Sequence, residues 1–475
     1  MKGDTSREIF TKSTLFFNKN TYLCQYINLL SRFEMIEYFT VKNYRSYRDL
    51  TELSFVASKK EGKKNDLPPA WYKEIDGKRI LRLVLCVGLN GTGKTKLFSA
   101  LSYLRMLVIS KPQTPTENPE YRPFLLDNHS KDEPTELTIA YYVGNRNYKY
   151  SIKISRTRIE EEELILLSSR ASRVYHRFFD ASQNRISIQY GSSCDLSKQD
   201  QHDLEVNTKA NASVLSVFRG LNMGSPILLE NYDFFQNRIG FVKQSNNKDL
   251  ADKLSTGDEE NDARMKKLLL ALLRDVETNI VDYRVEDASI SISELKSQGA
   301  PDLLLKMMLD QNPSGFFKHK ILKFIHSTPN GNCDLESGLE SLGTLNIVNL
   351  LVVLYDIVLR RKSSCIDEIE YGIHTKALAF ILKMYLTIAE DCQVIAATHD
   401  LSILDSSFLR RDAVRLFEKD SDGVTTFRKR EYLHNTMSFF RTYEKEVAPR
   451  IDQFLAEYEV FEKYKHYLED AEIHE

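Results

Sequence analysis

The stretch Gly88-Leu89-Asn90-Gly91-Thr92-Gly93-Lys94-Thr95 decides the fold of this 475-residue chain. Before it, Leu81 to Val87 is a continuous apolar run, which is typical of a strand buried on both faces. After it, from Lys94 to Ile109, apolar residues recur with the period of a helix. The sequence therefore predicts a glycine-rich loop between a buried strand and the helix that follows.

The residue types of this loop suit the binding of phosphate groups. Glycines let successive backbone N–H groups turn toward an anion without a Cβ in the way, and the helix adds its positive N-terminus. We expect all eight residues to surround a nucleotide, with Lys94 on the β- and γ-phosphates and the Thr95 hydroxyl on Mg²⁺. A glycine-rich turn that binds nothing is the alternative, and the predicted strand and helix count against it.

A pair of carboxylates follows a short predicted strand near the other end of the chain, in Ile366-Asp367-Glu368-Ile369-Glu370. Asp367 would hold Mg²⁺ through water, and Glu368 would act as the general base on the attacking water. A solvated acidic loop is the commoner meaning of such a pair. The preceding Ser363-Ser364-Cys365 is less apolar than strands of this kind, which counts against full burial.

A histidine ends another apolar run, in Val394 to Ala397 followed by Thr398-His399-Asp400. In this place His399 could hydrogen-bond a γ-phosphate and the attacking water, and a purely structural histidine is the alternative. Because the order of motifs is loop, carboxylate pair and histidine, we favour the catalytic role.

A fourth motif, Glu340-Ser341-Leu342-Gly343-Thr344, precedes a helix predicted over Leu345 to Leu359. Ser341 and Gly343 at a helix N-terminus would make a second seat for an anion. In ATPases that work as head-to-tail dimers, such a seat covers the nucleotide of the other subunit. An ordinary N-cap, in which Ser341 or Thr344 accepts hydrogen bonds from free N–H groups, is the alternative.

In this order the motifs resemble those of ABC-type ATPases of the SMC-like branch, above all the stand-alone AAA-type ATPases of prokaryotic defence loci. Val41-Lys42-Asn43-Tyr44-Arg45-Ser46-Tyr47-Arg48-Asp49 is similar to the strand and turn that open these proteins, which makes Arg45 and Ser46 accessory candidates beside the phosphates. The glutamine that couples many members to their partners is not placed by the sequence. Between residues 111 and 135, Gln113 alone comes near to fitting.

The resemblance implies an α/β fold, an ABC-type ATPase head of the P-loop NTPase class. Its mixed β-sheet lobe and parallel core sheet flanked by helices would carry a mostly helical insertion and a C-terminal helical tail. The expected parts are an appendage (1–34), lobe I (35–170), a largely helical insertion (171–330), lobe II (331–430) and the tail (431–475). We also expect a hairpin over 137–154, a polar surface loop over 192–211 and a polar linker over 244–262.

For function, the resemblance implies an enzyme that hydrolyses ATP with Mg²⁺. Two heads would sandwich the nucleotide in a homodimer or a higher homo-oligomer. Its defence relatives, such as the ATPase subunits of PARIS-type systems, imply a sensor that regulates a separate effector protein, a nuclease. One alternative is an SMC-like ATPase of DNA repair or recombination, which would need long heptad repeats that the stretch between Lys94 and Ser341 lacks. A self-contained signalling or metabolic ATPase is another.

The composition limits the kinds of partner and the cellular compartment that we expect for the chain. The net charge of -2 gives no overall basic field, so nucleic acid is neither indicated nor excluded. The six cysteines form no C-x-x-C pair, which favours a reducing cytoplasm over a disulfide framework or a zinc site. The run Leu345 to Leu359 is too short and too interrupted by polar residues for a membrane span, and we expect a buried core helix there.

Overall fold

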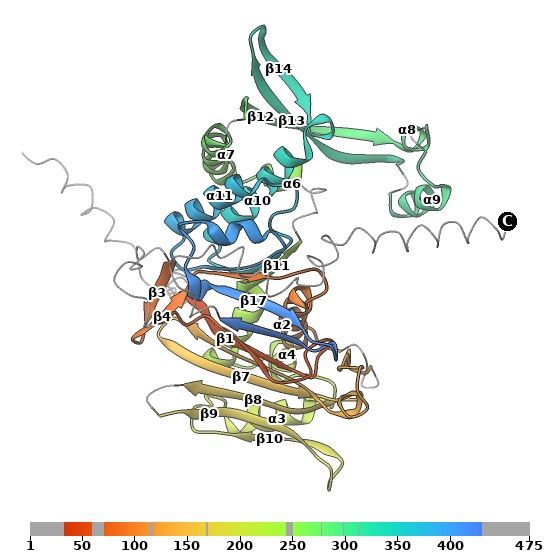
Figure 1. Cartoon of the computed structure of the whole chain (residues 1–475). Helices are drawn as coiled ribbons and strands as arrows, with labels where there is room; N and C mark the ends of the chain where they lie inside the picture. The colour runs from red at the N-terminus through yellow and green to blue at the C-terminus, as the bar shows by residue number, and fades with distance from the viewer. Residues whose placement is uncertain are drawn as a thin grey trace, which may run out of the picture.

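The computed structural model describes residues 33–429, apart from 59–70, 113, 115–116, 168–169, 244–249, 277, 298 and 313. The predicted appendage, except for its last two residues, and the predicted helical tail lie outside the described residues, as does Gln113. Two sheets with helices between them form the body, further helices cover the core sheet, and an arm projects from the body (Figure 1).

A six-stranded core sheet holds the glycine-rich loop. Its order is β11 (Ile239–Lys243), β15 (Ser363–Asp367), β16 (Gln393–Thr398), β5 (Leu83–Val87), β17 (Val414–Lys419) and β18 (Thr425–Lys429). The first five strands are parallel, and β18 runs antiparallel to β17. Every residue of β5 and β16 is buried, as expected for strands covered on both faces. The predicted strands at 364–366 and 393–397 are confirmed, and the one predicted over 81–87 is confirmed from residue 83, because Leu81 ends β4. Strands β11, β17 and β18 were not predicted.

Strand β15 is fully buried up to its last residue, although its polar start counted against this. Ser363 and Ser364 are each 1% exposed, and the Ser363 hydroxyl donates a hydrogen bond of 2.8 Å to Gln393 Oε1. Neighbouring β11 explains the small side chains, because a Cβ on Gly240 would lie 2.3 Å from Ser364 Oγ. Close approach of two backbones, not hydrophobicity, therefore selects serine here.

A seven-stranded antiparallel sheet forms the second layer. Its order is β10 (Arg185–Tyr190), β9 (Ser172–Asp180), β8 (Ile159–Leu167), β7 (Arg146–Ile154), β6 (Thr135–Val143), β1 (Glu34–Lys42) and β2 (Thr51–Ser54). The predicted hairpin is confirmed as β6 and β7. A small separate hairpin joins β3 (Tyr72–Ile75) and β4 (Lys78–Leu81). Gln393 ties the two main sheets together, since its side chain exchanges hydrogen bonds of 2.6 and 3.0 Å with the backbone of Ile36.

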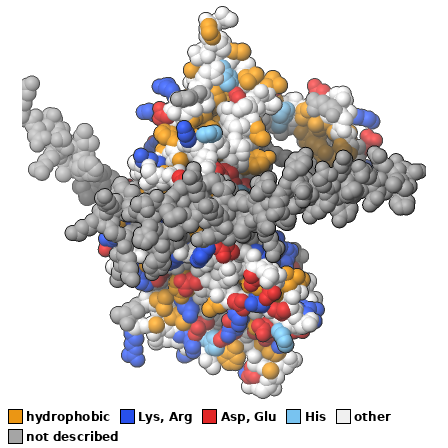
Figure 2. Space-filling view, viewed as in Figure 1, with side chains coloured by type: hydrophobic (Ala, Val, Ile, Leu, Met, Phe, Trp, Pro, Cys, Tyr) orange, Lys and Arg blue, Asp and Glu red, His pale blue; other side chains and the backbone are white. Residues whose placement is uncertain are grey.

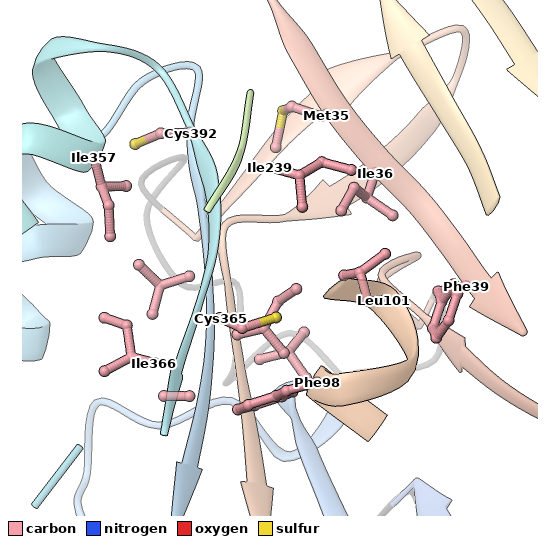
Figure 3. Close-up of a cluster of buried hydrophobic side chains, with 14 of the residues drawn as sticks. Met35, Ile36, Phe39, Phe98, Leu101, Ile239, Ile357, Cys365, Ile366 and Cys392 are labelled. Carbon is pink, nitrogen blue, oxygen red and sulfur yellow. The ribbon is translucent and has the colours of Figure 1, made fainter. Parts of the chain in front are cut away.

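The helix after the loop, α2 (Lys94–Ile109), is confirmed and lies between the two sheets. Phe98 and Leu101 on α2 face buried side chains of β1, β11 and β15, among them Met35, Ile239 and Cys365 (Figure 3). The same layer holds three further elements, α4 (Val214–Arg219), α5 (Pro226–Asp233) and a π-helical turn, η3 (Phe234–Arg238). This packing fixes the helix N-terminus at the edge of the core sheet.

Helices α10 (Leu342–Leu359) and α11 (Thr375–Ile388), with α6 (Leu250–Leu254) and α7 (Glu259–Asp275), form a group of their own over the core sheet (Figure 1). In the described part of the chain α10 is the one helix whose length and composition would suit a membrane span, and half of it is buried inside the protein. Its contacts with α6, α7 and α11 are those of a core helix, as predicted for Leu345 to Leu359. Short 3-10 turns complete the described chain: η2 (Ser130–Asp132), η4 (Ser337–Leu339), η5 (Leu401–Asp405) and η6 (Arg411–Ala413).

Residues 280–336 form the projecting arm. Its sheet consists of β12 (Ile280–Ser291), β13 (Phe316–Thr328) and β14 (Gly331–Glu336). The end of the sheet opposite the β13–β14 turn carries α8 (Ile292–Ser297) and α9 (Asp302–Gln311), which lie between β12 and β13 in the sequence (Figure 1). The prediction of a mainly helical stretch was wrong here. The strands alternate apolar and charged residues and cover few apolar partners, so no buried run marked them.

Three further expectations were wrong in detail. Strands β9 and β10 extend the antiparallel sheet past residue 170, so the start of the expected helical insertion belongs to that sheet. The expected polar loop at 192–211 contains α3 (Lys198–Asn207), which Ser197 caps and which buries only Leu204. Residues 250–262 of the expected polar linker hold α6 and the start of α7. For α3, a single buried side chain was too small a signal to show in the sequence. The proposed domain limits as such stay predictions.

Candidate nucleotide-binding site

The parallel strands of the core sheet end at one edge, and the glycine-rich loop lies there. Val87 pairs with Thr398 across β5 and β16, and Lys243 pairs with Asp367 across β11 and β15. Neighbouring strands lie about 4.8 Å apart and β16 alone separates β15 from β5, so these two strand ends are about 10 Å apart. Open α/β sheets bind their ligands at this carboxyl edge.

The loop needs glycine at specific positions. Gly91 and Gly93 have φ angles of 81° and 101°, in the left-handed region that other residues rarely adopt. A Cβ on Gly93 would lie 2.3 Å from Thr425 Oγ1 and 3.0 Å from Ser46 Oγ. The Thr425 hydroxyl also donates a hydrogen bond of 3.0 Å to the carbonyl of Thr92. Strand β18 and the turn after β1 therefore pack closely against the loop and leave no room for a side chain at position 93.

Lys94 lies inside the loop and is 4% exposed. Its Nζ donates hydrogen bonds of 2.6 Å to the Gly88 carbonyl and 2.9 Å to the Leu89 carbonyl. Burial lowers the pKa of Lys94 to about 8, because charged nitrogen loses hydration there. A phosphate oxygen would offer this buried cation the full negative charge that the carbonyl oxygens lack. Asn90, Gly91 and Thr95 are exposed at the mouth of the loop.

His399 reaches the same point from β16. Its Nδ1 lies 3.1 Å from Lys94 Nζ and 3.0 Å from the Gly88 carbonyl oxygen. One ring nitrogen can accept from the lysine or donate to the carbonyl, but not both at once. Glu370 fixes the backbone at this position, since its Oε1 accepts a 2.6 Å hydrogen bond from the His399 N–H. The structure thus brings His399 to the loop, and its role toward a γ-phosphate stays a prediction.

The predicted carboxylate pair lies at the end of β15. Asp367 is close enough that its charge, with that of Glu370, opposes the effect of burial on the pKa of Lys94. Glu368 has a φ of 54°, and its Oε2 lies 3.7 Å from Lys243 Nζ. A non-glycine residue in the left-handed region costs on the order of 1 kcal/mol and is common at functional sites. Backbone geometry and neighbours fit a positioned carboxylate better than a loose acidic loop.

Ser46 lies against the loop, since its Oγ is 3.0 Å from the point where a Cβ on Gly93 would lie, and Arg45 and Ser46 both line a cavity of about 530 Å³. Their place beside the phosphates stays a prediction. Four further cationic side chains line the cavity, those of Lys96, Arg122, Arg156 and Lys419. Its lining contains no carboxylate, and Tyr121, Pro123, Leu125 and Leu126 supply a less polar wall. The charge of this lining suits an anionic group.

Ser341 and Gly343 lie apart from this edge, at the N-terminus of α10. The Ser341 hydroxyl accepts a 3.1 Å hydrogen bond from the Thr344 N–H, so it is an N-cap. Gly343 packs closely on the turn after β15, where a Cβ would lie 3.1 Å from the Gly372 carbonyl oxygen. No hydrogen bond within the described ranges joins either residue to the loop. Ser341 is exposed, so a ligand held by another molecule can reach it.

The residues present fit a nucleoside triphosphate with Mg²⁺. Within residues 33–429, gaps excepted, no three His, Cys, Asp or Glu side chains gather into a metal site of their own. Mg²⁺ in such proteins takes few protein ligands and several phosphate and water oxygens, which suits Thr95 and Asp367. Glu370 Oε2, beside His399, is buried without a hydrogen-bond partner among the described residues, so it can accept a hydrogen bond from a bound group.

Several contributors to the site were not predicted. Thr425 and Tyr47 support the loop, the latter through a 3.0 Å hydrogen bond from its hydroxyl to the Gly93 carbonyl. Glu370 holds His399, and Lys243 pairs with Glu368. The sequence offered one usable signal: Glu370 belongs to the acidic motif itself. Thr425 lies 332 positions from Gly93 and carries no local sign of its contact.

Comparison with known proteins identifies a family for this chain and finds solved structures that it resembles only weakly. A head domain of SMC from Thermotoga maritima is 12% identical, with a TM-score of 0.38, over 84% of this chain and 99% of that one. An SMC head bound to the C-terminal winged-helix domain of ScpA is also 12% identical, with a TM-score of 0.38, over 83% and 97%. At such scores the likeness says nothing about what this chain binds or does. No curated protein matches significantly.

The family match covers the loop, the acidic motif and His399. Residues 85–405, about two thirds of the chain, match the family described as "AAA domain, putative AbiEii toxin, Type IV TA system". The span begins in β5 and ends after His399, so it contains the carboxyl edge assembled above. The chain is therefore an α/β P-loop protein that belongs to this family of AAA-domain proteins.

Proposed function

We propose that this protein binds ATP at the loop of residues 88–95 and hydrolyses it. The observation that carries the proposal is the cluster of Lys94, His399 and Glu370 beside the carboxylates that end β15. In this proposal Lys94 and the loop amides hold the β- and γ-phosphates.

Hydrolysis would be the work of residues at the strand ends. Bound Mg²⁺ supplies positive charge beside the γ-phosphate, with Thr95 and Asp367 as the residues that hold it. Glu368 orients a water and takes its proton. His399 contacts the γ-phosphate and so reports whether the nucleotide is a triphosphate.

We further propose that two copies meet head to tail, so that Ser341 and Gly343 of one cover the nucleotide of the other. The exposed N-cap at α10 supports this, because its hydroxyl and helix N-terminus can receive a phosphate from outside. The output would pass to a separate effector protein, a nuclease, in anti-phage defence. An SMC-like repair role would call for a long coiled coil, and β-structure occupies the arm instead.

Two substitutions test the ATPase proposal. Lys94→Ala should abolish ATP binding in calorimetry, because among the described residues Lys94 is the buried cation that enters the loop. Glu368→Gln should keep binding and lower phosphate release at least about a hundredfold, as expected for loss of a general base. The matched control is Glu260→Gln, a carboxylate on α7 that is 77% exposed and should behave as wild type. Equal rates of phosphate release in Glu368→Gln and wild type would refute the assignment.

A further inference from the structure

A short series of side-chain contacts joins the arm to the N-terminus of α10. The ring of His326, on β13, lies between two oxygen atoms: its Nδ1 is 2.8 Å from Asn279 Oδ1, and its Nε2 is 2.9 Å from Glu340 Oε2. The other carboxylate oxygen, Glu340 Oε1, accepts a 2.7 Å hydrogen bond from the backbone N–H of Ser341. The N-cap of α10 is thus connected to the arm through one histidine and one carboxylate.

This contact lies where the chain enters the arm after α7 and leaves it before α10. Figure 2 shows the arm as a projection from the body, and its strands β12 and β13 contact α7 and α6. His326 pairs with Ile280, the first residue of β12. The side chains of His326 and Glu340 are 14% and 9% exposed, so water and salt screen this pair less than an ion pair on the surface.

The carboxylate of Glu340 needs a balancing charge in this place. The N-terminus of α10 is the seat proposed for a phosphate, and a negative charge on the residue before Ser341 would repel that phosphate. Both ring nitrogens of His326 face oxygen atoms, so the imidazolium form, with a proton on each nitrogen, suits both neighbours. Neither Nε2 of His326 nor Oε2 of Glu340 hydrogen-bonds any other described residue, so each depends on the other.

We propose that His326 is a positioning residue for ATP hydrolysis by the neighbouring copy of the chain. Through Glu340 it fixes the backbone at Ser341, and it balances the negative charge beside the seat at α10. The inference rests on the proposed pairing of heads, in which Ser341 of one copy covers the nucleotide of the other. It adds a residue of the arm to the groups that serve that nucleotide, although His326 itself contacts no phosphate.

Steady-state ATPase kinetics of the full chain test this role. His326→Ala should lower kcat about tenfold, because an unbalanced carboxylate then stands beside the seat. The dissociation constant for ATP, measured on dilute and unpaired chains, should change less than about threefold, since Lys94 and its loop are untouched. The matched control is His319→Ala, which removes an exposed histidine from the same strand and should behave as wild type.

Removal of the charge separates positioning from a loss of packing in the arm. In the background of His326→Ala, Glu340→Gln takes away the unbalanced charge and keeps an oxygen that can accept from the Ser341 N–H. The double variant should therefore have a kcat at least about threefold above that of His326→Ala. The inference is overturned if His326→Ala matches wild type, or if the double variant is no faster than His326→Ala.

Mixed variants show whose nucleotide His326 serves. A mixture of His326→Ala with Lys94→Ala should exceed the mean activity of the two separate proteins, because each mixed dimer joins one intact loop to one intact seat. His326→Ala mixed with Ser341→Ala is the control and should stay at the mean, since both changes fall on the same seat. If Ser341→Ala complements Lys94→Ala but His326→Ala does not, the inference is overturned and the pairing of heads stands. If neither complements Lys94→Ala, the pairing of heads is overturned, and the inference with it.

Discussion

At the scale of single residues, the site depends on side chains that position others. Glu370 is the clearest case, since its carboxylate accepts from the backbone of His399 while the histidine ring meets Lys94. Loss of the Glu370 carboxylate would release the backbone at the end of β16, but it would remove no group that is proposed to contact the phosphates. Such a residue should affect turnover far more than affinity.

Glu370→Ala is therefore expected to lower kcat for ATP hydrolysis about tenfold, the usual cost of a hydrogen bond to a charged group. The dissociation constant for ATP should change less than about threefold, because Lys94 and the loop are intact. Glu370→Gln retains an acceptor oxygen and should recover part of the rate. A matching rise in the dissociation constant would show that Glu370 acts in binding instead.

A buried carboxyl far from the loop predicts a pH effect on stability. Burial raises the pKa of Glu34 to about 7 despite its ion pair with Arg238. A carboxyl with a higher pKa when folded holds its proton more tightly there, so its stabilising contribution is present below about pH 4.5 and is lost as pH rises through 7.

Glu34→Gln should remove this dependence. Between pH 5 and pH 8, the free energy of unfolding of wild type should fall by up to about 3 kcal/mol more than that of the variant. Thermal melts of both proteins at the two pH values measure the difference. The variant also lacks the ion pair with Arg238, and above pH 7 this changes its free energy of unfolding by an amount that does not depend on pH. Parallel pH profiles would contradict the raised pKa.

At the scale of elements, the contact between β11 and β15 depends on the absence of a side chain at Gly240. Gly240→Val should push β11 away, because even a Cβ would meet Ser364 Oγ at 2.3 Å. Overpacking of this kind costs about 1–3 kcal/mol. Gly240→Ala combined with Ser364→Gly should be more stable than Gly240→Ala alone, as a double-mutant cycle of melting temperatures would show. Additive effects would mean that the strands do not touch there.

The same elements explain what the sequence could and could not predict. Strand β5, the loop and α2 were predictable because an unbroken apolar run and a helical period announce them locally. Strand β11 is five residues long and follows a π-helical turn, so its membership of the core sheet depends on β15, more than a hundred positions away. The strands of the arm bury few side chains and left no strong pattern.

The residues of the candidate site likewise fall into two groups: those that local sequence patterns predicted, and those that only the fold brings together. The loop, the carboxylate pair and His399 stand at strand ends, and local patterns in the sequence were sufficient to place them there. Lys243, Thr425 and the lining of the basic cavity come together only through the fold. Burial of Ser363 and Ser364 was misjudged because hydrophobicity, not backbone proximity, was the criterion.

At the scale of the whole molecule, the proposed pairing of heads makes activity depend on two chains at each site. Specific ATPase activity should therefore fall as the protein is diluted toward nanomolar concentration. A single chain that keeps constant specific activity on dilution would contradict the proposal.

Complementation gives a sharper test. Lys94→Ala and Ser341→Ala should each be inactive alone, but a mixture should regain about a quarter of wild-type activity. About half of randomly assorted dimers are mixed, and each has one intact site. A mixture of Lys94→Ala with Glu368→Gln is the control and should stay inactive, since both changes fall on the same side of the nucleotide. No recovery in the first mixture would mean that Ser341 does not serve the other copy.

The strand order of the core sheet has a consequence for how the protein is made. Strand β5 leaves the ribosome first, yet its neighbours β16 and β17 follow about 300 residues later. At roughly 5–20 residues per second, the most apolar strand waits roughly 15–60 s for partners, a window in which chaperones would be needed. A half-made chain also lacks His399 and Thr425, so the nascent protein cannot close its phosphate loop before almost all of the described sequence has been translated.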